Sequence, residues 1–184
     1  MKINYLQYHI EFLSDPAFSP DSVDNLYLYN KVYFNPKEYH FPSIFGIKII
    51  ENDKLVESAV LGVRGGATEV HENSYILSKN RLYICCGNFV FCFSIPDLEI
   101  IWKVEVDKST CFRIFSVGDD FIINGEMAIS RIDRNGNIIW QRGGRDLFVT
   151  NDGTNHFSIK GNIISVKDFE NNFYKFDLEG NVID

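Results

Sequence analysis

Short runs of alternating apolar and polar residues, separated by turn residues, extend over most of this chain. Such alternation is typical of antiparallel β-strands, and the sequence offers almost no helical periodicity. A two-residue turn is expected at Asn52-Asp53, because both side chains tolerate positive φ. Gly87-Asn88 suits a type II′ turn, in which glycine takes the first central position. The pattern therefore predicts an all-β fold, with strands expected at Asn4–Glu11 and Asn25–Phe34 among others.

Part of this pattern recurs along the chain. The segment Asp133–Trp140 has a turn with Asp first and Gly fourth, followed by a short apolar run that ends in Trp. Related segments are found at Asp97–Trp102 and Asp177–Asp184. The Asp side chain is expected to accept hydrogen bonds from backbone amides two residues on, and the Gly to take the left-handed conformation. A period near 40 residues with several short strands per unit is typical of propeller blades.

The segment Asp133-Arg134-Asn135-Gly136-Asn137-Ile138-Ile139-Trp140 resembles the repeat of quinoprotein-type (PQQ-like) β-propellers. The resemblance covers roughly residues 80–184 and implies a blade architecture. The Asp-to-Gly spacing is one residue shorter than in the usual repeat, the first copy has Glu99 and no turn glycine, and the third has no Trp. Quinone-binding enzymes of that class close many blades around the cofactor, whereas this length allows about four blades. From this resemblance we therefore infer the blade architecture for this chain, and we infer no cofactor.

We predict an all-β, antiparallel, propeller-like stack of about four small repeated sheets. A β-sandwich or an open meander would produce similar patterning, and closure of the sheets into a ring cannot be read from it. We expect one domain over residues 1–184, with a divergent N-terminal blade at 1–66 and blade-like repeats at 67–184. Stacking buries both faces of a sheet, which accounts for the many Phe and Ile residues. Trp102 and Trp140 are expected between sheets rather than against a ligand.

The charge of the chain limits its partners. With 18 basic and 25 acidic residues the formal net charge is −7, which disfavours DNA, RNA and acidic membranes and suits a basic protein. The N-terminal residues lack the unbroken apolar stretch of a secretory signal, and no apolar run approaches the length of a membrane span. We therefore expect a soluble, cytoplasmic protein.

The cysteines and histidines are not arranged as a metal or catalytic site. We expect the cysteines to be buried free thiols, with Cys85 and Cys86 on opposite faces of one strand. The alternative is a redox pair between Cys85 and Cys92, which would lie diagonally on one face of a hairpin. The histidines are scattered without metal-ligand spacing, and we expect His71 and His156 in surface turns. No catalytic residue, cofactor or metal is predicted.

Two glycine-rich segments beside arginines are candidates for an anion site. Paired glycines expose backbone amides, and arginine binds carboxylate or phosphate in a bidentate manner. The alternative is that both segments are flexible connections between blades. Glu126 is expected either at a sheet end in water or paired with an arginine such as Arg131 or Arg113, and the alternative is a buried general acid. The candidate ligand contacts are Arg64, Gly65, Gly66, Glu126, Arg142, Gly143, Gly144 and Arg145.

The leading functional hypothesis is a non-enzymatic protein-binding module, for example an immunity-type protein that neutralises a basic toxin through an acidic face, or an accessory protein. The second is a small-ligand or anion-binding protein, or an enzyme, with a pocket at the blade ends lined by Arg64, Arg145, Glu126 and histidines. The third is a structural accessory or a piece of a longer propeller, since the third copy stops where its Trp would fall. A recognition patch is expected where N-terminal aromatic residues are exposed. These residues are Tyr27, Tyr29, Tyr33, Phe34, Tyr39 and Phe41.

Overall fold

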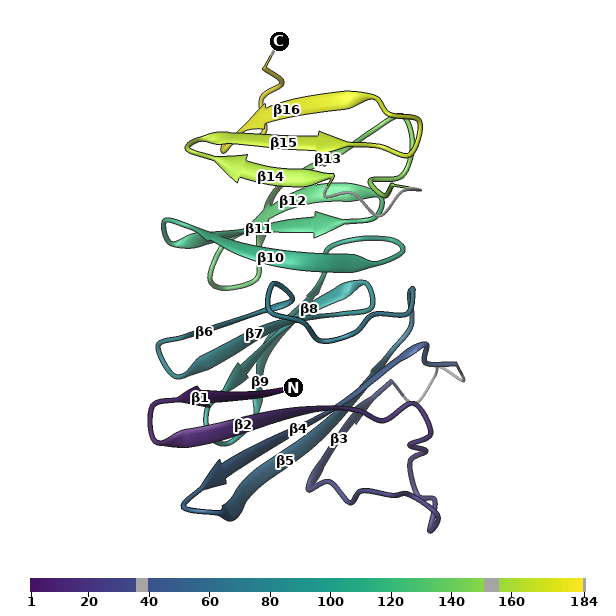
Figure 1. The fold of residues 1–184 in the computed structure, drawn as a ribbon, viewed down its shortest axis with the longest axis vertical. Helices are drawn as coiled ribbons and strands as arrows, with labels where there is room; N and C mark the ends of the chain where they lie inside the picture. Colours follow the sequence, from purple (N-terminus) through teal and green to yellow (C-terminus); the bar gives the residue numbers. More distant parts are fainter. Residues whose placement is uncertain (36–39, 151–155, 184) are drawn as a thin grey trace.

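The computed structural model describes residues 1–35, 40–150 and 156–183, and their regular secondary structure consists of β-strands. Four sheets follow one another along the long axis, from the N-terminal sheet at the bottom of Figure 1 to the C-terminal sheet at the top. The predicted all-β fold of four mostly antiparallel sheets is confirmed. Because the first and last sheets lie at opposite ends, the sheets form an open stack and do not close into a ring.

The first sheet has five strands in the order β1-β2-β4-β5-β3. These are β1 (Lys2–Tyr5), β2 (Tyr8–Ser14), β3 (Lys31–Phe34), β4 (Ser43–Glu51) and β5 (Lys54–Val63). The prediction of one strand over Asn4–Glu11 was wrong, because Leu6 has a φ of 56° and turns the chain back on itself. The expected strand over Asn25–Phe34 pairs only from Lys31 onward, where β3 runs parallel to β5.

The next two sheets have four antiparallel strands each, and the last has three. The second contains β6 (Tyr75–Ser78), β7 (Arg81–Cys86), β8 (Phe89–Ser94) and β9 (Ile100–Glu105). The third contains β10 (Cys111–Val117), β11 (Asp120–Gly125), β12 (Ala128–Ile132) and β13 (Ile138–Gly143). The fourth contains β14 (Phe157–Lys160), β15 (Ile163–Lys167) and β16 (Phe173–Asp177). Beside β16 the chain forms a single bridge, from Phe176 to Val182.

The turns take the predicted conformations. Asn52 and Asp53 both have positive φ, at 48° and 60°, and Gly87 has a φ of 54°. Gly136 lies in the left-handed region with a φ of 84°. The Asp133 carboxylate accepts hydrogen bonds from the backbone amides of Asn135 and Asn137, both at 2.8 Å. The turn chemistry expected from the sequence is therefore present in the fold.

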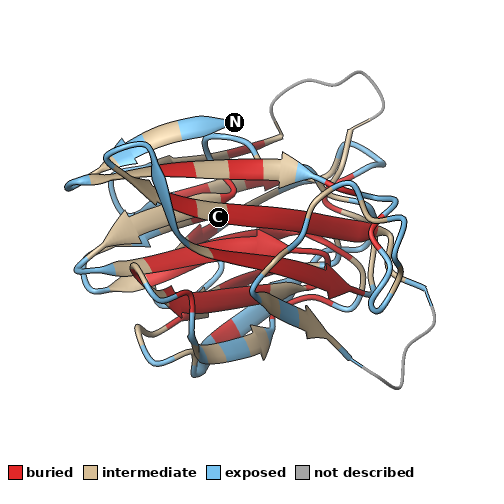
Figure 2. Cartoon of the chain, turned by 90° about the horizontal axis from the view of Figure 1, so that it is seen from below, coloured by how far each residue is buried: buried red, intermediate tan, exposed pale blue. Residues whose placement is uncertain are grey.

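Each pair of consecutive sheets shares one apolar core. Ile47 of β4 and Phe93 of β8 belong to the first core, and Cys85 of β7 and Phe121 of β11 to the second. The third core joins the third and fourth sheets. Figure 2 shows the buried residues along the middle of the stacked strands and the exposed residues mainly toward their ends. Cys86 lies in the first core and Cys85 in the second, which confirms that they face opposite sides.

A tryptophan on the outer strand of one sheet contacts the turn of the next. The Trp102 indole Nε1–H donates to the carbonyl of Arg134 at 2.9 Å, and its ring packs against Gly136. Trp140 repeats this contact one sheet later, with its Nε1–H on the carbonyl of Leu178 at 2.9 Å. The predicted position of both tryptophans between sheets is confirmed.

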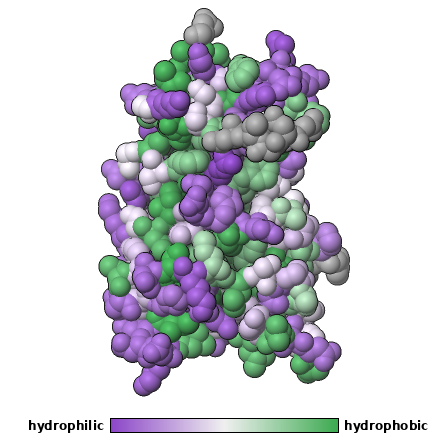
Figure 3. Space-filling model, in the orientation of Figure 1, coloured by the Kyte–Doolittle hydropathy of each residue, from purple (hydrophilic) through white to green (hydrophobic). Residues whose placement is uncertain are grey.

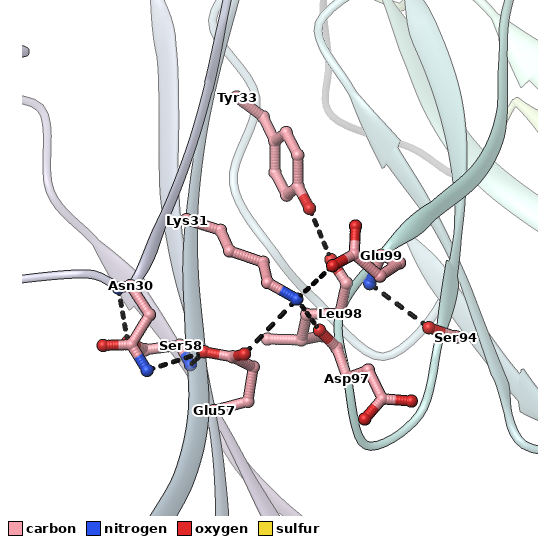
Figure 4. A network of polar contacts seen from close by, with 9 residues as sticks. All are labelled: Asn30, Lys31, Tyr33, Glu57, Ser58, Ser94, Asp97, Leu98 and Glu99. Atoms are coloured by element: carbon pink, nitrogen blue, oxygen red, sulfur yellow. Dashed lines mark hydrogen bonds and ion pairs between the residues drawn. The ribbon is translucent and has the colours of Figure 1, made fainter.

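A tyrosine makes the corresponding contact between the first and second sheets (Figure 4). The Tyr33 hydroxyl on β3 donates to the Leu98 carbonyl at 2.8 Å, at the turn position that Arg134 and Leu178 occupy later. Next to it, the Lys31 ammonium lies 2.7 Å from the Glu99 carboxylate and also donates to the Asp97 carbonyl. The β3 strand therefore takes the place of the outer strands β9 and β13.

The two ends of the stack differ from its interior. Aromatic side chains cover the outer face of the first sheet, with the rings of Tyr29 and Phe34 lying directly over Gly46 and Gly62. The outer face of the last sheet is mixed, with lysines such as Lys160 and Lys175 beside the exposed Ile163 and Phe173. Among the residues that the structure describes, none belongs to a helix that could cross a bilayer.

Candidate functional site

Three of the candidate anion contacts gather around the loop between the second and third sheets. The backbone N–H of Gly66 donates to the Ser109 carbonyl at 3.1 Å. The Ser109 hydroxyl in turn donates to the Glu126 carboxylate at 2.6 Å. Gly65, with a φ of 103°, lies against the same loop. Ser109 therefore connects the first glycine pair to Glu126, in contacts between successive sheets.

The arginines beside these glycines lie in separate places. Arg64 faces the Glu105 carboxylate at 3.6 Å. The Arg142 side chain donates from Nε to the Gly180 carbonyl at 2.8 Å, with its guanidinium 6.0 Å from the Trp140 ring centre. The backbone N–H of Arg145 donates to the Tyr174 hydroxyl at 2.9 Å. Arg142 and Arg145 thus join the third sheet to the fourth, whereas Arg64 faces a residue of the second sheet.

The two glycines between Arg142 and Arg145 also have packing roles. The carbonyl of Met127 lies close to Gly143, and the Phe148 ring lies over Gly144. Arg131, one of the partners expected for Glu126, instead binds the Asp120 carboxylate at 2.8 Å. An anion site at the two Gly-Arg segments remains a prediction.

The four cysteines are buried free thiols, as expected, and Cys85 and Cys92 are not bonded to each other. Burial raises the pKa of the Cys92 thiol to about 11 and also raises the pKa of the Cys111 thiol well above its usual value. Within the described parts of the chain, no group of three or more His, Cys, Asp or Glu side chains is placed to hold a metal ion.

A cavity of about 650 Å³ lies where β10 and β14 begin, and we call it the β10–β14 cavity. Its polar lining includes His71 before β6, Arg113 on β10 and His156 just before β14. The other lining residues are Glu72, Asn73, Phe112, Val149 and Thr150. Two of the histidines that the sequence left scattered thus line one cavity together with Arg113. Their spacings of 42 and 43 residues are close to the repeat period, a signal that was available in the sequence.

One ring atom of His156 is buried without a visible partner. Its Nε2 atom has no hydrogen-bond partner among the residues that the structure describes. Burial, and secondarily the positive charge of Arg113, lower the pKa of His156, so its ring is neutral near pH 7. His71 is in the polar turn where it was expected. Its Nδ1 accepts from the Asn73 backbone N–H at 3.2 Å, which leaves the ring proton of its neutral form on Nε2.

A second feature is an exposed apolar segment before β3, which we call the apolar ridge and define as Val23, Leu26 and Leu28. Their side chains are 97%, 80% and 84% exposed. Isolated exposed aliphatic residues are ordinary, whereas here three of them stand within six positions of one segment. Hydrophobic residues stand among hydrophilic ones in Figure 3 at the lower end of the molecule, where this segment lies in Figure 1.

The polar and aromatic residues of the same segment hold the ridge in place. The Asn25 amide donates to the carbonyls of Ser19 and Ser22 at 2.8 and 3.0 Å. The Tyr29 hydroxyl donates to the Asp15 carboxylate at 3.0 Å, and the Lys48 ammonium lies 4.6 Å from the ring centre of Tyr27. Burial, followed by the Asp15 hydrogen bond, raises the pKa of Tyr29.

The aromatic residues expected to form a recognition patch are therefore mostly occupied in packing. Tyr27, Tyr29, Tyr33, Phe34 and Phe41 are half-buried, and Tyr39 lies outside the described residues. Side chains alternate along this extended segment, so the tyrosines face the sheet and the leucines between them face outward. The exposed apolar surface is thus on the opposite side of the segment from the predicted patch.

Comparison with known proteins identifies similar folds but no function. No protein-family model and no curated protein sequence matches this chain. The computationally designed Ika8 protein superposes with a TM-score of 0.53 and 8% identity, covering 100% of this chain and 59% of Ika8. BamB from Moraxella catarrhalis superposes with a TM-score of 0.51 and 14% identity, covering 75% of this chain and 42% of BamB. The chain therefore spans about half the length of these proteins.

Both superposed proteins are β-propellers. The likeness confirms, at the level of fold, the resemblance of the sequence repeat to propeller blades. This chain has a β-propeller-like fold built as an open stack of four sheets.

Proposed function

We propose that this protein is a non-enzymatic protein-binding module that docks its partner on the apolar ridge. The observation that supports this proposal is the exposure of Val23, Leu26 and Leu28 on a segment fixed by hydrogen bonds on its inner side. Apolar side chains held in place before binding lose little conformational entropy when a partner covers them. Burial of each such side chain contributes about 1.5–3 kcal/mol before the other costs of association are subtracted.

The partner has an apolar pocket bordered by basic residues. Asp21 and Asp24 are exposed beside the ridge, and the whole chain carries a net charge of −7. Opposite charges around an apolar contact speed association and exclude wrong partners. This chemistry fits an immunity-type or accessory protein that covers a basic protein. We place this function in the cytoplasm, because four free thiols are typical of a reducing compartment.

A photo-crosslinking amino acid at position 26 tests the proposal, with the same group at Ile139 of β13, which is 51% exposed, as the control. In lysate of the source cell, the position-26 protein should capture a partner that the position-139 protein does not. The captured partner is then produced separately, and its affinity for this chain is measured by calorimetry.

Substitution of the ridge leucines tests whether the captured partner binds at the apolar ridge. The double variant Leu26→Ser/Leu28→Ser should bind the purified partner roughly 100-fold more weakly, since two buried leucines are lost. Ile139→Ser should leave the affinity unchanged. Equal affinities for both variants, or capture of the same proteins from both positions, would overturn the proposal.

A further inference from the structure

We propose that the outer face of the last sheet docks on the apolar ridge of a second copy of this chain, so that copies join head to tail. We call this outer face the lysine face, and its members are Lys160, Ile163, Lys167, Phe173 and Lys175. The inference rests on the proposed docking function of the ridge and names a second copy of the chain as the partner.

Strand alternation turns the lysine face away from the core of the molecule. Ile164 and Val166 of β15 and Phe176 of β16 belong to the core that the last sheet shares with the third. Side chains at neighbouring positions of a strand point to the opposite face of the sheet. The members of the lysine face therefore point outward, toward the end of the stack.

The apolar and basic side chains of the lysine face are interleaved. Lys160 of β14 lies opposite Ile163 of β15 in the strand register. Lys167 of β15 lies opposite Phe173 of β16, and its ammonium is 5.8 Å from the centre of the Phe173 ring. Each of these two apolar side chains thus has a lysine as its cross-strand neighbour, which provides apolar contact area bordered by basic groups.

The lysine face is basic although the whole chain carries a net charge of −7. The Asp177 carboxylate on the same side accepts hydrogen bonds from the backbone and side-chain N–H groups of Asn181, at 2.7 and 2.8 Å. The nearby Glu179 carboxylate lies 3.2 Å from the Arg131 guanidinium. Lys160 and Lys175, by contrast, are exposed, so this end of the molecule presents positive charge to an approaching partner.

The apolar ridge is complementary to this face in both respects. Phe173 is 79% exposed and offers an apolar contact for the ridge residues Val23, Leu26 and Leu28. The exposed Asp21 and Asp24 beside the ridge have the opposite charge to the lysines. A pair of lysine faces, or a pair of ridges, would instead bring like charges together, which opposes association. Charge complementarity therefore favours contact of one ridge with one lysine face.

The two surfaces lie at opposite ends of the stack (Figure 1). The tyrosines of the ridge segment face the first sheet, so Leu26 and Leu28 point outward at that end. The contact would continue the stack from one copy into the next. A contact between two different surfaces leaves one of each free after every addition, so it can propagate into longer assemblies.

Sedimentation of the purified wild-type protein at increasing concentrations, up to about 1 mM, tests for this association. We expect the average mass to rise above that of the monomer as the concentration increases. The ridge variant Leu26→Ser/Leu28→Ser and the face variant Lys160→Glu/Lys175→Glu should each self-associate at least tenfold more weakly. The control Lys54→Glu/Lys108→Glu, which changes the charge by the same amount at exposed positions elsewhere, should associate like the wild type.

An equimolar mixture of the ridge variant and the face variant gives the decisive result. The first keeps its lysine face and the second keeps its ridge, so the mixture should form a dimer of one copy of each and nothing larger. A wild-type protein that stays monomeric, a mixture that stays monomeric, or a control that loses association as the face variant does would each overturn the inference. The face variant retains the ridge and should bind a partner captured at position 26 with wild-type affinity. If it does so while the wild-type protein alone stays monomeric, the docking function holds and only the second copy is rejected as partner.

Discussion

Gly180 shows how one residue joins a turn to an interface between sheets. It has a φ of 81°, and an added Cβ would lie 2.6 Å from the Trp140 ring. Gly161 has a φ of 58° with nothing within 4 Å of an added Cβ, so it shares the backbone requirement without the contact. The Trp140 contact therefore accounts for the difference between these two glycines.

Alanine at these positions should separate the two effects. Gly161→Ala is expected to cost about 1 kcal/mol of unfolding free energy, from the left-handed backbone alone. Gly180→Ala should cost about 3 kcal/mol, because the tryptophan must also shift. Urea unfolding at neutral pH measures both values. Equal losses for the two variants would show that the ring of Trp140 does not pack tightly on this turn.

Asp133 makes the stability of its turn dependent on pH. The hydrogen bond from the Asn137 side chain, with help from backbone amides, lowers the pKa of Asp133. Below its usual pKa this carboxyl binds more protons in the unfolded chain than in the folded one. Its contribution to stability is therefore present above the unfolded-state pKa and is lost as pH falls through the lower folded-state pKa.

Replacement of the Asp133 carboxylate should make the unfolding free energy of the protein less dependent on pH in the acid range. Asp133→Ala is expected to be less stable than the wild type at pH 7, and the difference should shrink steadily as the pH falls below about 4. Asp119→Ala, which removes a carboxylate paired with the Arg134 side chain on the surface, is the control. Unfolding by urea across this pH range gives the comparison. A difference that stays constant down to pH 3 would contradict the assigned pKa shift.

Residues in the turns were the easiest to predict, because their conformations depend on local chemistry. Asn52 and Asp53 have the positive φ values that their side chains tolerate, and Gly136 has the positive φ that glycine adopts because it lacks a Cβ. The site residues were harder, because His71, Arg113 and His156 approach one another only through the packing of three sheets. Their spacing near the repeat period was visible, but the spacing alone does not show which side chains line a cavity.

At the scale of the element, β3 makes a contact between sheets that the sequence pattern did not predict. It lies parallel to β5 and brings the Tyr33 hydroxyl to the turn of the second sheet, where later sheets use a tryptophan. An alternating run predicts a strand but does not give its partner or direction, since those depend on residues far along the chain. The prediction of one strand at Asn4–Glu11 missed the turn at Leu6 for a local reason, because Leu6 and Gln7 are not residues that usually signal a tight turn.

The hydroxyl of Tyr33 should contribute measurably to the contact between the first two sheets. Tyr33→Phe removes its hydrogen bond to the Leu98 carbonyl and is expected to cost about 1 kcal/mol of unfolding free energy. Tyr27→Phe, at a half-buried ring that faces Lys48, should cost less than half as much. Thermal or urea unfolding measures both. A larger loss for Tyr27→Phe would mean that β3 is not fixed by this hydroxyl.

At the scale of the whole molecule, the number of sheets was predictable and their closure was not. Sheets with two apolar faces stack in the same way in an open row or in a ring, so hydrophobic patterning does not distinguish the two. The ends of this stack carry the information instead. An aromatic layer with Tyr29 covers one end, and the face at the other end carries lysines such as Lys175 together with the exposed Phe173.

The open stack is tested most directly by distances between spin labels measured by pulsed electron paramagnetic resonance. Labels on single cysteines at exposed positions 56, 101, 139 and 173 mark the four sheets in order, and the buried native thiols should remain unlabelled. The wild-type protein, treated with the label, is the background control. We predict that the distance from position 56 to position 173 exceeds the distance between the labels of any two neighbouring sheets. A distance from 56 to 173 as short as those between neighbours would show a closed ring and contradict this structure.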